Sequence, residues 1–455
     1  MINIIVVLTK YLIIILMLLY TLLCFRVFKQ TGGKSQKRIL KKQLFLIYSM
    51  DFVAFMVIFL QLKDVKILLF FGAQIIYFTL VQVLYRIFYK KAAMLLLNHM
   101  CMLLSIGFIM LARLDLDKAV KQFQIVAAAT LVALLIPVMI RKIKFFKKLT
   151  WVYAAVGILL LSVVLVLGRT EYGAKLSISI GGFALQPSEF VKIIFVFFIA
   201  TRLYKNTEFK ELVITTAVAA AHVLILVISK DLGNALVFFI TYLIMVYVAT
   251  KKPLYLAAGA AGGSVAAVGA YYLFAHVRQR VTAWKDPFSV YDTNGYQIVQ
   301  SLFAIGTGGW FGMGLGQGSP DTIPVVMQDF IFAAICEELG GVFALCLILV
   351  CMSLFLLVVN ISLQMKNPFY KLIALGLGVE YAFQVFLTIG GTIKFIPLTG
   401  ITLPLVSYGG SSVSSTIIML AIIQGLYILR EDEDVEIEKQ KEQRNAQANQ
   451  KRAKT

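Results

Sequence analysis

Long apolar stretches recur along the whole chain and are separated by short polar connections. A membrane-spanning helix needs about 20 mostly apolar residues, and hydropathy predicts thirteen such spans in this sequence. Their approximate extents are 4–25, 44–62, 67–85, 93–112, 123–140, 151–168, 184–203, 212–229, 232–250, 254–274, 328–359, 370–389 and 410–429. The pattern therefore predicts an all-α polytopic membrane protein.

Composition agrees with this class. Hydrophobic residues make up 60% of the 455 positions and charged residues only 15%, whereas soluble domains average about 45 to 50% and about 25%. The mean hydropathy is +0.87. These values exclude a string of soluble domains.

Positive charge is concentrated in every second connection, for example in 26–42, 86–91 and 141–148. Because lysine and arginine are retained on the cytoplasmic side of a membrane, these connections are predicted to be cytoplasmic. The N-terminus is then outside and the charged tail, 430–455, inside, either disordered or as a loose helix at the membrane surface. The net charge of +20 suits a surface facing anionic membrane lipids, not nucleic acid.

One polar interruption is much longer than the others and spans about 275–325, on the predicted outer side. It combines basic residues suited to phosphate, flat aromatic rings suited to sugars or to anchoring at the membrane interface, and carboxylates that can serve as general bases. In that order, these candidates are Arg278 and Arg280, then Trp284 and Tyr296, then Asp286 and Asp292.

Polar side chains within predicted spans are informative because burying them in a membrane is costly. Glu189 and Lys192 are three residues apart and are expected to share one helix face, as a structural ion pair or as part of a site. Asp231 is placed to cap the helix that follows it. The sequence thus predicts two groups of charged side chains near the outer ends of spans, the pair Glu189 and Lys192 and the single residue Asp231.

Three carboxylates occur near the start of the predicted span 328–359, namely Asp329, Glu337 and Glu338. The adjacent glutamates are expected to face a polar cavity, to be partly protonated, or to pair with a base. The candidate bases are Arg278, Arg280 and Lys394.

The segment KFIPLTGITLPLVSYGGSS, which includes Lys394, Ser407 and Ser411, contains two prolines and a Gly-Gly pair before the last span. Irregular backbone at membrane depth persists only when it is buried in protein or lines a cavity. The segment is predicted either to re-enter the membrane beside the long loop or to form an ordinary turn that caps the last helix.

Several stretches together resemble the SEDS family, which contains FtsW, RodA and SpoVE. They are QPSEFVKIIF, DLGNALVFF, RQRVTAWKDPF, GYQIVQSLFAIGTGGWFGMGLGQG, IPVVMQDFIFAAICEELGG and FIPLTGITLPLVSYGGSS. The resemblance covers roughly Met94 to Leu429. It implies a ten-helix core, 93–429, containing the long loop, preceded by three additional helices in 1–92 and followed by the tail.

The resemblance implies a peptidoglycan glycosyltransferase of the bacterial cytoplasmic membrane. Such an enzyme polymerises lipid II on the outer face during division, elongation or sporulation, together with a class B penicillin-binding protein. A divalent cation, Mg²⁺ or Mn²⁺, is one way to lower the charge of the leaving group. The predicted catalytic residues are Asp286 and Asp292, and the predicted substrate-binding residues are Glu189, Lys192, Arg278, Arg280, Trp284, Tyr296, Gln297, Asp329, Glu337, Lys394, Ser407 and Ser411.

One position departs from the family pattern. Many members carry an aspartate five residues before the glycine of the GYQ motif, and here that position is Val290. Three hypotheses follow: a polymerase that uses Asp286 or Asp292, a catalytically weak relative that regulates a penicillin-binding protein, and a flippase or other transporter of lipid-linked precursors.

Overall fold

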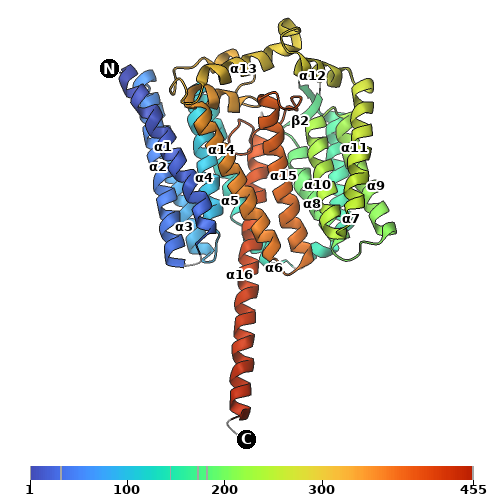
Figure 1. The fold of residues 1–455 in the computed structure, drawn as a ribbon. Coiled ribbons are helices and arrows are strands. Elements are labelled where there is room, and N and C mark those ends of the chain that lie inside the picture. Colours follow the sequence, from blue (N-terminus) through green and yellow to red (C-terminus); the bar gives the residue numbers. More distant parts are fainter. Residues whose placement is uncertain (1, 31–32, 144, 172–173, 181–182, 453–455) are drawn as a thin grey trace.

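The apolar stretches fold into long helices that run side by side (Figure 1). The structure is a computed structural model that describes residues 2–30, 33–143, 145–171, 174–180 and 183–452. Within these residues, twelve helices are long and apolar enough to cross a membrane. The remaining predicted span, 184–203, corresponds to a helix of 16 residues, α8 (Ser188–Leu203). The predicted all-α polytopic fold is confirmed.

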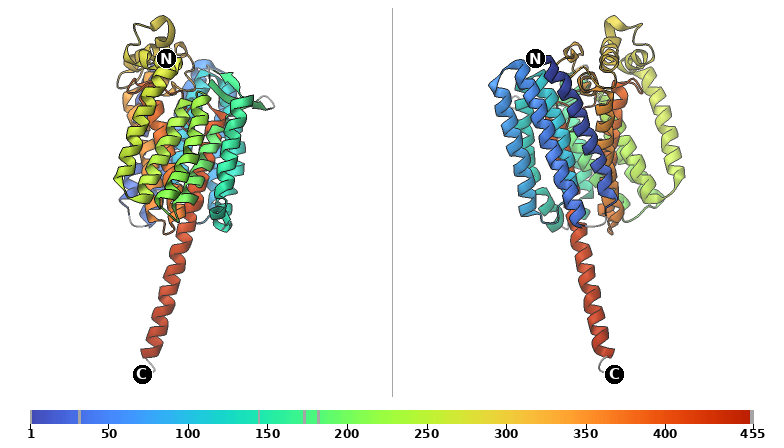
Figure 2. Two further views of the ribbon diagram at one scale, coloured as in Figure 1. Left: turned by 90° about the vertical axis from the view of Figure 1, so that its right-hand side faces the viewer. Right: turned by 60° about the vertical axis from the view of Figure 1, so that its left-hand side comes forward.

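The first three helices lie together along one edge of the bundle (Figures 1 and 2). They are α1 (Ile2–Phe28), α2 (Gly33–Leu62) and α3 (Val65–Phe88). The N-terminus lies at the end of the bundle that carries the long loop, and the C-terminus projects from the opposite end. This relative arrangement is the one that the charge pattern requires, while the side of the membrane that each end faces stays a prediction.

Most of the remaining long helices, together with the shorter α6 and α8, form the main bundle. Neighbouring helices enclose α4, because 94% of its most apolar 18 residues are buried, whereas α11 lies at the edge, with none of its most apolar residues buried. The predicted span 123–140 is divided into α5 and α6, since Pro137 lacks the N–H needed to continue a helix. The helices are α4 (Met94–Leu114), α5 (Leu116–Ala133), α6 (Ile136–Lys142), α7 (Thr150–Leu167), α8, α9 (Phe209–Ile228), α10 (Leu232–Thr250), α11 (Pro253–Leu273), α14 (Ile331–Gln364), α15 (Pro368–Thr392) and α16 (Gly410–Arg452).

A small antiparallel sheet connects α7 to α8. Its strands, in the order β1-β2-β3, are β1 (Arg169–Glu171), β2 (Ala174–Ile180) and β3 (Phe183–Leu185). The alternation of polar and apolar residues in KLSISI is typical of a strand. The predicted span 184–203 was therefore extended too far toward the N-terminus, because its first residues belong to β3 and α8 begins only after Pro187.

The long polar stretch folds into short helices that lie across one end of the bundle (Figure 2). They are α12 (Ala275–Lys285), a π-helical turn (Tyr291–Gly295), α13 (Tyr296–Gly308) and a 3₁₀ turn (Pro320–Thr322). Charged residues and glycines hide these short elements from hydropathy, which detects only long apolar stretches.

The helix α14 begins at Ile331 and is interrupted at Gly340, where φ is 87° and ψ is 167°. Residues 309–318, here called the Gly-rich segment, pack against this interruption. The backbone N–H groups of Met313 and Gly314 donate to the carbonyls of Glu337 and Glu338, both at 2.9 Å. The segment thus satisfies backbone groups that the broken helix leaves free, as membrane depth requires.

The charged tail continues α16 as one helix to Arg452. In Figure 1 this helix projects away from the bundle instead of lying across its end. Of the two expectations, disorder is therefore wrong for the described residues, while the position of the helix relative to the membrane surface stays a prediction. Lys91 and Arg141 pair with Asp432 at 2.8 and 2.6 Å, which fixes the base of the projecting helix.

Candidate functional site

A polar cavity of about 1110 Å³ opens at the end of the bundle that carries the long loop. Its walls come mainly from α12, the start of α13, residues 324–329, the start of α10 and the segment 398–412, and residues of α5, β2, β3 and the end of α11 complete the lining. The segment 398–412 belongs to the Pro- and Gly-rich stretch predicted to re-enter the membrane. Its contribution to the cavity favours the re-entrant interpretation over an ordinary turn.

The helix α12 turns one face toward the cavity. His276, Gln279, Arg280 and Ala283 line it, and their spacing of three or four residues is that of one helical face. Arg278 points elsewhere: it is exposed and lines a smaller neighbouring pocket. The helix therefore separates the two arginines that the sequence assigned to one role.

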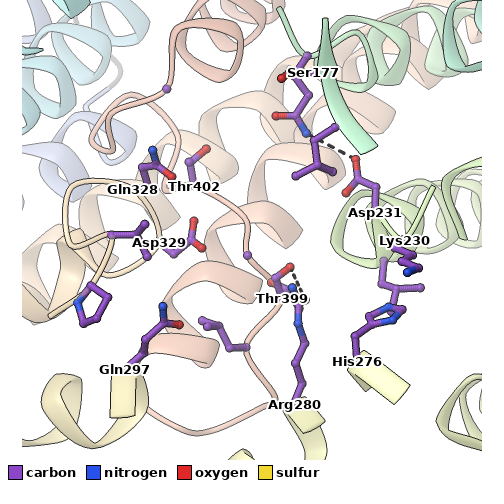
Figure 3. A pocket seen from close by; sticks show the side chains of 18 of the residues that line it. Ser177, Lys230, Asp231, His276, Arg280, Gln297, Gln328, Asp329, Thr399 and Thr402 are labelled. Atoms are coloured by element: carbon purple, nitrogen blue, oxygen red, sulfur yellow. Dashed lines mark hydrogen bonds between the residues drawn. The ribbon is translucent and has the colours of Figure 1, made fainter. Parts of the chain in front are cut away.

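Arg280 is the arginine that reaches the cavity (Figure 3). Its Nη1 donates a hydrogen bond of 2.9 Å to the carbonyl of Thr399 in the re-entrant segment. A Cβ built at Gly400 would lie 3.5 Å from Nη2 of Arg280 and 3.7 Å from Oδ2 of Asp329, so both side chains approach this glycine. The φ of +77° at Gly400 also favours glycine. The guanidinium is thus fixed to the re-entrant segment and lines the cavity.

Asp329 lies near Arg280 in the same cavity (Figure 3). Its backbone is positioned by Thr392, whose hydroxyl donates 3.1 Å to the Asp329 carbonyl. Burial raises the pKa of the Asp329 carboxyl to about 6, and the nearby Arg280 guanidinium opposes that rise. A carboxylate with a pKa near the working pH has the property required of a general base.

Asp231 is a second carboxylate in the cavity wall. It caps α10 as predicted, accepting from the backbone N–H of Asn234 at 3.3 Å. Its other hydrogen bonds come from the Asn234 amide at 2.9 Å and the Ser188 hydroxyl at 3.1 Å. Burial raises the pKa of Asp231, and these hydrogen bonds counteract the rise. Figure 3 places Asp231 and Asp329 on different walls.

Glu189 and Lys192 form the predicted ion pair, at 2.7 Å on one face of α8. Lys192 also donates to Gln384 at 2.7 Å, and Glu189 accepts from Ser415 at 3.0 Å. Both are buried but are not among the described residues that line the cavity. The pair joins α8, α15 and α16 behind the cavity wall.

Of the two adjacent glutamates, Glu338 pairs with a basic residue, and this residue is none of the predicted Arg278, Arg280 and Lys394. Glu338 pairs with Arg113 of α4 at 2.9 Å and accepts from the backbone N–H of Gly316 at 3.0 Å. Glu337 accepts from the N–H of Ser319 at 2.9 Å. Arg113 was overlooked because it lies 225 positions from Glu338, and no local spacing connects them. These carboxylates hold the Gly-rich segment and lie outside the cavity lining.

Removal of Arg113 is expected to destabilise the protein strongly. In Arg113→Met, Glu338 remains as a buried charge without its cation, which costs about 3 to 5 kcal/mol in comparable pairs. We expect a clear fall in the thermal unfolding midpoint in detergent. The matched control is Lys118→Met, since Lys118 pairs with Asp115 in the same region at 3.2 Å but is half-exposed. Equal shifts for both variants would contradict a stabilising role for the buried pair.

Other predicted substrate-binding residues divide into two groups. Tyr296, Gln297 and Ser411 line the cavity. Trp284 and Ser407 instead hold the re-entrant segment: the indole donates 3.1 Å to the Lys394 carbonyl, and Ser407 accepts from the N–H of Leu403 at 2.8 Å. Lys394, like these two, is not among the described residues of the lining.

The two predicted catalytic aspartates lie on the outside of the loop. Asp286 is exposed and accepts from the N–H of Ser289 at 3.3 Å, which closes a turn. Asp292 is also exposed, although the next residue, Thr293, lines the cavity. Val290 lies beside Arg278 in the smaller pocket. Catalysis by either aspartate stays a prediction.

Several cavity residues were not proposed from the sequence, among them Lys121, Lys230, His276 and Gln279. His276 precedes Arg280 by one helical turn, so recognition of α12 as a helix would have found it. Burial lowers the pKa of His276, and Arg280 and Lys230 lower it further. With Arg280, the lysines provide positive charge around the cavity.

The predicted divalent cation finds no ready-made site. No group of three or more His, Cys, Asp or Glu side chains in the described part of the chain is placed to hold a metal ion. Mg²⁺ often binds through only one or two carboxylates plus substrate phosphates. Asp231 already accepts several hydrogen bonds from protein groups. The described residues therefore do not fit a site built by protein ligands alone.

Comparison with known proteins identifies the family. The family model described as "Cell cycle protein", for FtsW, RodA and SpoVE, matches residues 91–431. The chain belongs to this family. The match begins just after α3, so the first three helices precede it.

Relatives within the family carry related names. Peptidoglycan glycosyltransferase RodA of Mycobacterium tuberculosis (strain ATCC 25618 / H37Rv) is 35% identical over 358 residues, which cover 72% of this chain and 76% of the relative. Probable peptidoglycan glycosyltransferase FtsW of Aliivibrio salmonicida is 35% identical, covering 56% of this chain and 67% of the relative. Stage V sporulation protein E of Bacillus subtilis is 34% identical, covering 60% and 77%.

Solved structures of the same fold agree with the helix arrangement. The crystal structure of Thermus thermophilus RodA is 24% identical, with a TM-score of 0.57, and covers 74% of this chain and 97% of that one. A chain from a peptidoglycan synthase complex gives a TM-score of 0.62 at 24% identity, with the same coverage. This FtsW/RodA/SpoVE family member is a multi-pass protein of the cytoplasmic membrane.

Proposed function

We propose that this family member is a peptidoglycan glycosyltransferase that polymerises lipid II into glycan strands at the outer face of the cytoplasmic membrane. The observation that carries the proposal is the cavity in which Arg280, held by Thr399, lies near the half-buried Asp329. The names of the curated relatives support the same activity.

The chemistry requires a proton acceptor and an anion site. A sugar hydroxyl attacks the anomeric carbon of a lipid-linked sugar, the bond from that carbon to the pyrophosphate oxygen breaks, and the hydroxyl proton must be accepted. Asp329, with a pKa raised to about 6 by burial, suits the role of acceptor. Arg280 suits the pyrophosphate, because a guanidinium presents paired donors to phosphate oxygens.

Positive charge around the cavity supports the same assignment. Lys121 and Lys230 line it together with Arg280, so the leaving pyrophosphate would meet several cations as its charge develops. We assign no step to a metal ion, because the described residues do not form a site of three protein ligands. A divalent cation held mainly by substrate phosphates stays a proposal, and its test is the rate in the presence of a chelator.

A partner protein is the finer part of the proposal. One structural neighbour is a chain of a peptidoglycan synthase complex that coordinates polymerisation and crosslinking. By analogy we propose that this chain works with a class B penicillin-binding protein, which crosslinks the strands. The exposed apolar helix faces are expected to contact membrane lipids.

The alternative of a catalytically weak regulator is favoured by one observation, the valine at position 290 in place of the aspartate of many relatives. The cavity argues for activity nonetheless, since Asp329 provides a carboxylate inside it. The two functions differ in whether the protein forms glycan strands by its own chemistry.

The deciding experiment uses the purified full chain in vesicles that contain lipid II, with and without a class B penicillin-binding protein. We expect glycan strands from the wild type and their loss in Arg280→Gln. Lipid translocation without strands would favour a transporter. A wild type that makes no strands, while Val290→Asp makes them, would favour the weak relative and overturn the proposal.

A further inference from the structure

The helices that precede the family match make direct contact with the Gly-rich segment, 309–318. Lys10 of α1 donates from Nζ to the carbonyl of Gly312 at 3.0 Å. Gln61, near the end of α2, donates from Nε2 to the carbonyl of Leu315 at 2.7 Å. The rings of Tyr11 and Phe311 lie 5.8 Å apart. Both helices thus contact the segment at the end of the bundle that carries the cavity.

The Gly-rich segment is held from its other side as well. The N–H of Gly316 donates to Glu338 at 3.0 Å, and Arg113 donates to the carbonyl of Gly318 at 3.1 Å. A Cβ at Gly316 would lie 1.9 Å from Oε1 of Gln61, and φ there is +76°. The segment therefore fits closely between the N-terminal helices and the core.

Buried polar contacts fix the N-terminal helices on the core. Asn98 of α4 accepts from Gln82 of α3 at 2.9 Å and donates to Gln43 of α2 at 3.0 Å. The hydroxyls of Tyr77 and Thr130 form a further hydrogen bond of 2.7 Å between α3 and α5. Hydrogen bonds across helices specify how membrane helices associate. A group of helices fixed in this way can support a neighbouring segment.

The supported segment connects two walls of the cavity. Before it, α13 contributes Tyr296 and Gln297, and after it, residues 324–329 contribute Asp329. We propose that α1 to α3 position the Gly-rich segment, and through it both walls, and that Lys10 and Gln61 are positioning residues for the reaction. This inference rests on the proposed function only for its activity measurement.

The test compares Lys10→Met, Gln61→Leu and the double variant with the full-length wild type. Matched controls are Gln36→Leu, at the opposite end of α2, and Lys66→Met, which is exposed at the start of α3. Two quantities are measured: the rate of strand formation from lipid II, and deuterium uptake by backbone amides of 309–318, α13 and α15.

We expect the double variant to lower kcat by roughly 10- to 100-fold, because displacement of reacting groups by about an ångström has an effect of that size. Deuterium uptake should rise in 309–318 and α13 but not in α15. Lys10→Arg keeps a hydrogen-bond donor at this position, so its rate should be close to that of the wild type, unlike the rate of Lys10→Met. A merely structural loss would instead raise uptake throughout the bundle.

The inference would be overturned if the double variant took up deuterium in 309–318 as slowly as the wild type does. It would also be overturned if the double variant formed strands at the wild-type rate. If the double variant does not fold, Lys10→Met alone provides the same comparison, since Lys10 is only half-buried. If the wild type forms no strands, the proposed function fails, whereas deuterium uptake still tests the support of the segment.

Discussion

Replacement of Arg280 by glutamine is expected to lower the rate of strand formation by about 100-fold or more, the usual effect of losing a preorganised donor to developing charge. Arg280 lies inside the cavity and is oriented by its bond of 2.9 Å to Thr399. Glutamine removes the charge and the paired donors. The measurement is the initial rate of glycan formation from lipid II at saturating and limiting substrate.

Arg278 is the matched comparison because it lies two residues earlier on the same helix but is exposed and lines only the smaller pocket. We expect Arg278→Gln to lose much less activity than Arg280→Gln. Arg280→Lys should be intermediate, since it keeps the charge but not the planar fork. Equal losses of activity in Arg278→Gln and Arg280→Gln would indicate that the loop attracts the anionic substrate by its overall charge. That result would contradict a specific site in the cavity.

Asp329→Asn is expected to reduce the rate by about 100-fold or more, the contribution typical of a positioned general base. The wild-type rate should fall as the pH drops below about 6, because burial raises the pKa of Asp329 to about 6 and a protonated carboxyl cannot accept a proton. The pH–rate profile of Asp329→Asn should lack this acid limb. A fall near pH 6 that persists in the variant would assign the titration to another group.

The sequence-based alternatives provide controls for the same experiment. Asp286→Asn and Asp292→Asn remove exposed carboxylates outside the described cavity lining, so we expect smaller losses than in Asp329→Asn. Complete loss in Asp292→Asn with little effect in Asp329→Asn would show that the loop moves to bring Asp292 into the site. The prediction made from the sequence would then hold, and the one made from the cavity would fail.

Local patterns account for the parts of the fold that the sequence predicted well. A membrane-spanning helix satisfies its backbone hydrogen bonds internally, so each apolar stretch identifies its own span. The pair Glu189 and Lys192, three residues apart, needs only the geometry of one helix, and so does the Asp231 cap of α10. The N-terminal boundary of α8 was misplaced because a short strand interrupts the pattern there.

Contacts between distant residues account for what could not be predicted. Glu338 meets Arg113 across 225 positions, and Arg280 meets Thr399 across 119. The sequence predicted Asp286 and Asp292 as catalytic residues and Asp329 only as a substrate-binding residue, although all three lie in or beside the polar loop. The tertiary structure shows that Asp286 closes an exposed turn and that α12 turns Arg280, but not Arg278, toward the cavity that Asp329 also lines.

The sequence by itself determined the membrane class, twelve of the thirteen predicted spans and the family resemblance, because these depend on apolar length and on residues adjacent along the chain. The tertiary structure decided which carboxylate and which arginine share a cavity, and that α1 and α2 reach the Gly-rich segment. Those relations arise from the packing of helices and loops far apart in the chain, and packing of this kind leaves no periodic signal in any one segment.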